Sequence, residues 1–325
     1  MWRIHLSTDD IRRIRIAPDI DPLWELVHSI QLLDSGGPVI FGPWRRRVRL
    51  AGLGRWSMLR HLSPPTGYFA DFLTPATGTT DLRVGIEEVL RTPRACLRSD
   101  LVTLHEQCPR PAGWVRDLAA GDRQTLRALG TNLIQFHETH LKPSWEEIRR
   151  QVSDELIRVR RLLCDEGVDA LLASLGGHVH WEAPVLVLRN KRTDRDLYVD
   201  GRGIVIQPSF FALGDTSILD VPGEPFVLAY PIRHRLGWWD TRTEGIRLDA
   251  VIGKTRADML DCLANGDRST TDLARALDLS SATASEQTKA LREAGLITTR
   301  RTGKSVLHTL SSTGATLLGT PAPPS

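Results

Sequence analysis

The sequence predicts an α+β protein: a mainly helical N-terminal domain that contains a small antiparallel sheet, followed by a C-terminal domain of helices and one β-hairpin. Three patterns support this prediction. Apolar residues recur at helical spacing through much of residues 81–165. After residue 177 the pattern changes to short apolar runs separated by turn residues, as in strands. Residues 246–318 return to helical spacing and end in two alternating segments joined by a tight turn.

Composition limits the classes of protein to which the chain can belong. With 325 residues, 41% apolar and 25% charged, it has the size of two or three soluble domains. The net charge of +3 is too small for a chain coated in basic residues, although it allows a local basic face. The N-terminus lacks the apolar core of a signal peptide, and no apolar run reaches membrane-spanning length. We therefore expect a cytoplasmic protein with no membrane partner.

Residues 1–175 form the predicted helical regulatory region. It opens with a strand and a short helix capped by Ser7 or Thr8, and continues into an amphipathic helix at residues 23–33. Three arginines at residues 45–47 are interpreted as a solvated or DNA-flanking patch. Most of the remaining region is expected to be helical, broken where prolines occur.

Residues 176–245 are predicted to add a small antiparallel sheet and a polar connector to the same N-terminal domain. Short β-branched and aromatic runs alternate there with turn residues, which is the pattern of consecutive paired strands. A disordered tail is expected at residues 319–325 because it is short, terminal and rich in proline. The predicted strands are residues 184–188, 196–199, 203–206 and 226–230.

Residues 246–318 contain the most specific pattern in the chain. A first helix is expected to end at the Asn-Gly pair at 265–266, and a second, short helix is expected at 272–277 after a Ser-Thr-Thr cap. A third helix is predicted at 281–294 and ends at Gly295. Two short helices joined by a turn of three or four residues are typical of a helix-turn-helix.

The segment after the third helix identifies the variety of helix-turn-helix. Residues 296–301 alternate as a strand, a tight turn follows, and residues 305–310 return as a second strand. A hairpin with a basic tip directly after the third helix is a wing. The C-terminal domain is therefore predicted to be a winged helix-turn-helix that binds DNA.

These residues resemble a known family. The segments LARALDLSSATAS at 273–285 and LREAGLI at 291–297 are similar to the ArsR-type winged-helix regulators. Residues 41–45, 67–75, 200–203 and 208–211 carry a weaker resemblance to the N-terminal region of the large actinobacterial form of these regulators. The resemblance implies a transcriptional regulator that represses by binding a palindromic operator as a homodimer. The N-terminal domain would then sense a small molecule or dimerise.

The predicted DNA contacts follow from helix and hairpin geometry. Short hydroxyls near the start of a recognition helix contact phosphates or base edges, and a glutamine can pair with adenine. Basic residues of the wing contact the flanking backbone. Glu286 would repel phosphate unless it accepts a hydrogen bond from a cytosine amine, and Thr288 stands where the family usually buries a leucine. The predicted contact residues are Ser281, Thr283, Ser285, Gln287, Lys289, Arg300, Arg301 and Lys304.

No metal, cofactor or catalytic residue is predicted. The four cysteines are isolated from each other, and the metal-ligating cysteines, aspartates and histidines of ArsR-type sensors have no counterpart here. His137 and His140 share a helix face and could hold a metal together with Glu146 or Glu147, but solvated histidines at a helix end are the preferred interpretation. The chain lacks GxSxG, HExxH and phosphate-loop motifs, so we expect no enzyme. The alternative is an uncharacterised enzyme whose winged helix only dimerises or binds protein.

Overall fold

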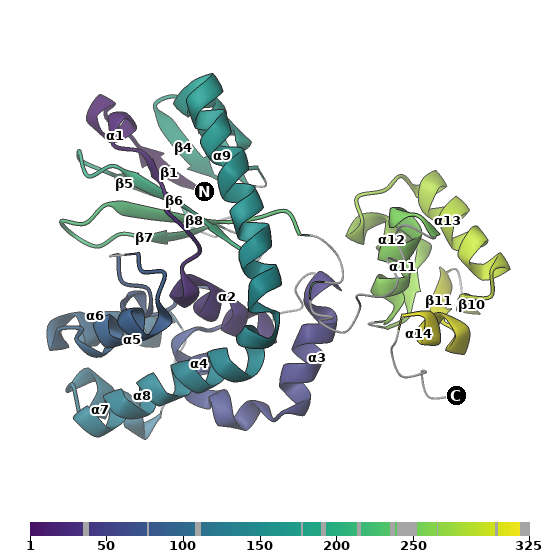
Figure 1. The fold of residues 1–325 in the computed structure, drawn as a ribbon, viewed down its shortest axis with the longest axis horizontal. Coiled ribbons are helices and arrows are strands. Elements are labelled where there is room, and N and C mark those ends of the chain that lie inside the picture. Colours follow the sequence, from purple (N-terminus) through teal and green to yellow (C-terminus); the bar gives the residue numbers. More distant parts are fainter. Residues whose placement is uncertain are drawn as a thin grey trace. The chain divides into compact units, whose positions relative to one another are not determined.

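In the computed structural model the chain forms two units (Figure 1). Unit 1 comprises Met1–Gly36 and Val48–Arg235, and unit 2 comprises Gly37–Arg47 and Leu236–Ser325. The predicted tail at 319–325, Lys304 and most of the predicted connector lie outside the described residues. The structure describes residues 1–34, 39–76, 78–107, 112–176, 178–189, 193–212, 216–234, 238, 252–264, 266–302 and 305–318.

Unit 1 is rich in helices, as the apolar periodicity predicts. Its longest helix, α9, spans Trp145–Ser174 and is kinked at Gly167, whose φ of 85° is unfavourable for a residue with a side chain. Ser7 caps the first helix as predicted, through a capping box with Asp10. The other helices are α1 Thr8–Arg12, α2 Pro22–Asp34, α4 Ser57–Leu62, α5 Leu82–Leu90, α6 Arg94–Gln107, α7 Gly113–Ala119 and α8 Arg123–Phe136, with short 3-10 or π turns at Leu53–Trp56, Asp71–Leu73, His137–Leu141 and Lys142–Ser144.

The strands of unit 1 form two four-stranded sheets, in the orders β3-β4-β1-β5 and β2-β6-β8-β7. The prediction of one small antiparallel sheet is correct only in part. Pairs β1/β5 and β2/β6 are parallel and join strands from the N-terminus to strands that follow residue 178. Pair β6/β8 is parallel as well, because β7, the strand between them in sequence, lies on the outer side of β8. The strands are β1 Trp2–His5, β2 Arg15–Ile16, β3 Val179–Glu182, β4 Val185–Leu188, β5 Arg195–Tyr198, β6 Ile204–Ser209, β7 Ser217–Leu219 and β8 Phe226–Pro231.

One apolar core joins both sheets to α9. Ile4 from β1, Leu186 from β4 and Ile206 from β6 are fully buried in it. Val159 and Leu172 contribute to the same core from α9, which crosses the strands in Figure 1. The long helix therefore holds strands from the two ends of unit 1 together by burial of apolar area.

A buried acid joins α2 to the residues that follow β6. Glu25 is fully buried, and its two carboxylate oxygens accept hydrogen bonds from the backbone N–H groups of Phe210 (2.8 Å) and Phe211 (3.0 Å). The Ser209 hydroxyl bonds to the same carboxylate and to His28, which is also buried. This network satisfies backbone groups where the strand ends, so it is part of the fold and has no exposed reactive atom.

Unit 2 contains the C-terminal helices and a three-stranded sheet in the order β10-β11-β9. Its core is built from apolar residues of three helices, including Met259, Leu273 and Leu291. The hairpin β10–β11 is antiparallel from Ile297↔Leu310 to Thr302↔Ser305. The elements are α11 Lys254–Ala264, β9 Arg268–Ser269, α12 Thr270–Ala276, α13 Ser281–Glu293, β10 Ile297–Thr302, β11 Ser305–Leu310 and α14 Ser312–Leu317.

A segment from the first part of the chain belongs to unit 2. The short turn Val39–Phe41 and the start of α3, which spans Gly42–Leu50, pack with Trp238. Trp238 donates from Nε1 to the carbonyl of Ile40 (3.2 Å), and its ring lies 5.8 Å from that of Phe41. Arg46 donates to the carbonyl of Ala264, at the end of α11 (3.1 Å). Sequence patterns gave no indication of this long-range packing.

The Glu25 network predicts a pH dependence of stability. Burial raises the pKa of Glu25 to about 8 from its ordinary 4.5, so folded unit 1 retains a proton that the unfolded chain releases. The free energy of unfolding therefore loses the Glu25 contribution as pH rises from about 5 to about 8. We expect wild type to lose stability over this range relative to Glu25→Gln, measured by urea denaturation.

Comparison with Glu25→Gln also controls for the titration of the other buried groups. Burial also raises the pKa of Asp21 and lowers that of His28, and both effects are common to wild type and Glu25→Gln. A difference in unfolding free energy between the two proteins that stays constant from about pH 5 to pH 8 would contradict this account.

Candidate nucleic-acid interface

Helices α12 and α13 form a helix-turn-helix (Figure 1). Ser269 begins α12 with a capping box: its hydroxyl accepts from the N–H of Asp272 (3.1 Å), and the Asp272 carboxylate accepts from the N–H of Ser269 (3.3 Å). The turn between the helices uses Asp278 at a φ of 52°, in the left-handed region that aspartate tolerates. Ser280 then caps α13, where its hydroxyl accepts from the N–H of Thr283 (3.1 Å).

The inward face of α13 is short of large apolar side chains. Ala284, Thr288 and Leu291 are its buried residues. The Thr288 hydroxyl donates to the carbonyl of Ala284 (2.9 Å), one turn earlier on the same helix. The threonine that replaces a family leucine is therefore buried without an unsatisfied polar atom. These three residues fix which side of α13 faces solvent.

Three of the five contact residues predicted on α13 are exposed. Ser281, Ser285 and Lys289 lie open to solvent, and Lys289 approaches Glu293 at 3.9 Å. Thr283 is half-buried, and its hydroxyl is engaged with that of Ser280 at 2.8 Å. The exposed serines and Lys289 therefore offer two hydroxyls and one cation to a ligand along this helix.

Gln287 differs from the expectation for a base-contacting residue. It is half-buried on the flank of α13 that adjoins α11, and its Oε1 accepts a hydrogen bond from Nε of Arg256 (2.9 Å). Arginine only donates, so the amide oxygen must face it. Bidentate pairing with adenine uses both ends of the amide, so Gln287 would have to share its oxygen between the base and Arg256, or release Arg256. No sequence pattern indicates the contact between Arg256 and Gln287.

The hairpin carries the predicted basic residues of the wing. Arg300 and Arg301 are both exposed, and consecutive residues of a strand point to opposite faces. Arg300 lies 3.9 Å from Asp267, while Lys304 is outside the described residues. His308 anchors the base of the hairpin: it is buried and contacts the hydroxyls of Thr270 (2.9 Å) and Thr299 (3.0 Å).

The preferred interpretation of His137 and His140 as solvated residues is wrong. They lie on a π-helical turn and are only 7% and 6% exposed. Burial lowers the pKa of each to about 4, so both are neutral near pH 7. His140 packs edge-on against Trp56, and His137 against Trp145. No group of three potential metal ligands occurs among the described residues.

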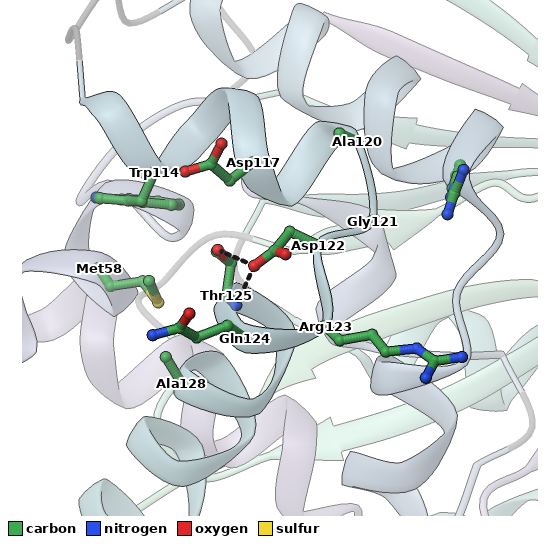
Figure 2. Close-up of a pocket in the computed structure, with 11 residues that line it drawn as sticks. Met58, Trp114, Asp117, Ala120, Gly121, Asp122, Arg123, Gln124, Thr125 and Ala128 are labelled. Carbon is green, nitrogen blue, oxygen red and sulfur yellow. Dashed lines mark hydrogen bonds between the residues drawn. The ribbon is translucent and has the colours of Figure 1, made fainter.

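A groove with a volume of about 920 Å³ opens on the helical part of unit 1 (Figure 2). Trp114 and Asp117 of α7 line one side, with Met58 of α4 and Gln124 of α8 across from them. Asp122, at the start of α8, is engaged with Thr125 at 2.8 and 2.9 Å. The backbone of Gln124 also hydrogen-bonds to Asp122, whereas the side chains of Asp117 and Gln124 form no hydrogen bond or ion pair within the described part of the chain. The groove thus combines an apolar wall with uncommitted polar groups.

The described helices include none that is long and apolar enough to cross a membrane. The aromatic side chains of Trp44, Trp56, Phe69, Phe210 and Phe211 are buried in the packed interior.

The capping box of α12 predicts a measurable cost on removal. Ser269→Ala should lower the free energy of unfolding of unit 2 by about 1 kcal/mol, because an N–H of α12 loses its partner. Hydrogen exchange of the α12 and α13 amides would locate the loss. Ser281→Ala is the matched control, since Ser281 is exposed and caps no helix. Equal protection of the two variants would contradict the prediction.

Comparison with known proteins supports the helix-turn-helix assignment. Residues 253–299 match the family model of bacterial regulatory proteins of the arsR family. The match begins just before α11 and ends within β10, so it includes both helices of the helix-turn-helix. No curated protein and no solved structure matches the chain. The resemblance noted from residues 273–297 is therefore confirmed for this domain, while that of the N-terminal region stays a prediction.

Proposed function

We propose that this chain, which carries an arsR-family regulatory domain at residues 253–299, is a transcriptional regulator that binds double-stranded DNA through α13 and the hairpin. The observation that supports the proposal most directly is the coincidence of two results. The family match and the helix-turn-helix occupy the same residues. The exposed side of that motif also carries hydroxyls and cations suited to a phosphate backbone.

Local charge supports the same proposal. Residues 280–310 contain five basic residues and two acidic ones, although the whole chain carries only +3. Arg300 and Arg301 are exposed on the hairpin, where they can approach backbone phosphates beside the helix. A concentration of positive charge next to a recognition helix gives salt-dependent, sequence-independent affinity.

The proposed assembly is a homodimer on a palindromic operator, and the proposed outcome is repression. One recognition helix contacts only a few base pairs, so a second copy related by twofold symmetry supplies the missing affinity and specificity. The two helices would then occupy successive major grooves about 34–36 Å apart. A dimer at this position competes with other proteins for the same DNA.

We also propose that unit 1 senses a small molecule in the groove between Trp114 and Gln124. Trp114 and Met58 suit an aromatic or aliphatic body, and the Asp117 carboxylate suits an amino group beside the Trp114 ring. Arg94 and Arg123 also line the groove, so the ligand class is a small organic amine that also carries an acidic group. Its effect on the regulator depends on different affinities for the DNA-bound and free states.

Charge reversal on the hairpin tests DNA binding. Arg300→Glu and Arg301→Glu should each weaken binding to all DNA sequences, and lower the slope of log affinity against log salt by about 1. Fluorescence anisotropy with a labelled duplex at several salt concentrations measures both. Arg12→Glu makes the same charge change on exposed α1 of unit 1, and should leave both quantities unchanged. Wild type without salt-dependent binding would refute the function.

Filling the groove tests the sensing proposal. Ala128 lines it and is half-buried, so Ala128→Trp should occupy the space of a ligand. A thermal-shift screen of small amines should find compounds that raise the melting temperature of wild type and not of the variant. The same compounds should change the affinity of wild type for DNA. If every stabilising amine acts equally on both proteins, the groove is not the site.

A further inference from the structure

We propose that Glu286 recognises a cytosine amine in the major groove, so that each half-site of the operator contains a C·G pair opposite the middle of α13. The proposal rests on the proposed function, DNA binding by this helix. In this proposal an acidic side chain determines which base is preferred, although phosphate groups repel it.

Glu286 lies on the side of α13 opposite the buried residues. Ala284 and Thr288 are buried, and Glu286 lies two residues from each of them. At about 100° per residue, a displacement of two residues places a side chain nearly opposite. Glu286 is therefore at the centre of the outward face, and its side chain is exposed. Gln287 lies on the flank instead, where Arg256 holds its amide oxygen.

The side chains that precede Glu286 on the outward face are small. Ala282 and Ser285, its neighbours toward the start of α13, are exposed and small. Small side chains on this side let the helix backbone approach a groove closely, and they leave Glu286 as the longest side chain over the first two turns of the outward face. Its carboxylate is therefore placed to extend furthest toward the base edges.

Within the described residues, the Glu286 carboxylate is available to a ligand. Lys289 is the nearest cation along the outward face, and its ammonium group approaches Glu293, on the far side from Glu286. Among the residues that the structure describes, Glu286 forms neither an ion pair nor a hydrogen bond. A free carboxylate between two phosphate backbones opposes binding unless a donor in the groove compensates for it.

The four bases differ in how well they can pair with a carboxylate in the major groove. Guanine and thymine present acceptors in the major groove, which repel a carboxylate. Adenine offers its N6 amine, but the acceptor N7 lies beside it. Cytosine presents the N4 amine without an adjacent acceptor on the same base, so it is the best partner. We expect discrimination of about tenfold or more between C·G and T·A at this position.

In vitro selection from random duplexes tests the proposal, with wild type, Glu286→Gln and Glu293→Gln. Wild type should enrich sites with one fixed C·G pair in each half-site. Glu286→Gln should lose the cytosine at that position alone and keep the rest of the site. Glu293→Gln removes the same charge from the same helix, from an exposed residue near Lys289, and should keep the cytosine.

Direct titration of the selected duplex gives a second readout. Changing C·G to T·A should weaken wild type about tenfold or more, and Glu286→Gln by clearly less. The proposal is overturned if Glu286→Gln selects the same sequence as wild type and binds all duplexes more tightly, because Glu286 would then only repel the backbone. If wild type binds no duplex in a salt-dependent way, it is the proposed function that fails.

Discussion

Packing of the buried side of α13 determines the chemistry that unit 2 presents to solvent. Ala284, Thr288 and Leu291 lie against the other helices of the unit, and Leu291 shares a core with Met259 and Leu273. Because a helix is rigid, burying one face assigns every other side chain to a flank or to the outside. This buried side therefore decides which hydroxyls, which cation and which acid α13 presents to DNA in the proposed complex. Thr288 completes it without an orphaned hydroxyl by bonding to its own helix.

Local signals in the sequence were sufficient for the helix-turn-helix. Ser269 and Ser280 begin α12 and α13 at the positions that capping chemistry predicts, and Gly295 follows the end of α13 at a φ of 70°. The alternating residues after Gly295 form the expected hairpin. Caps, turns and alternation depend on neighbours in the chain, so a single sequence contains them.

Contacts between distant residues could not be predicted in the same way. The parallel pairing of β1 with β5 joins segments nearly two hundred residues apart, and no local pattern specifies that partner. The packing of Trp238 with Phe41 has the same character. The position of Gln287 was also misjudged from the sequence. Its spacing permits an outward position, but the residues that are actually buried place it on a flank of α13, next to Arg256. A small error in the predicted direction of the buried face is therefore enough to mistake a flank residue for one at the centre of the exposed face.

In the proposed complex, two copies of α13 occupy successive major grooves of one operator. Hydroxyl-radical footprinting on a duplex obtained by selection with wild type tests it most directly. We expect two protected tracts related by twofold symmetry, with centres about one helical turn apart on the same face of the DNA. A single protected tract, or uniform protection along the duplex at a salt concentration where the complex persists, would contradict it.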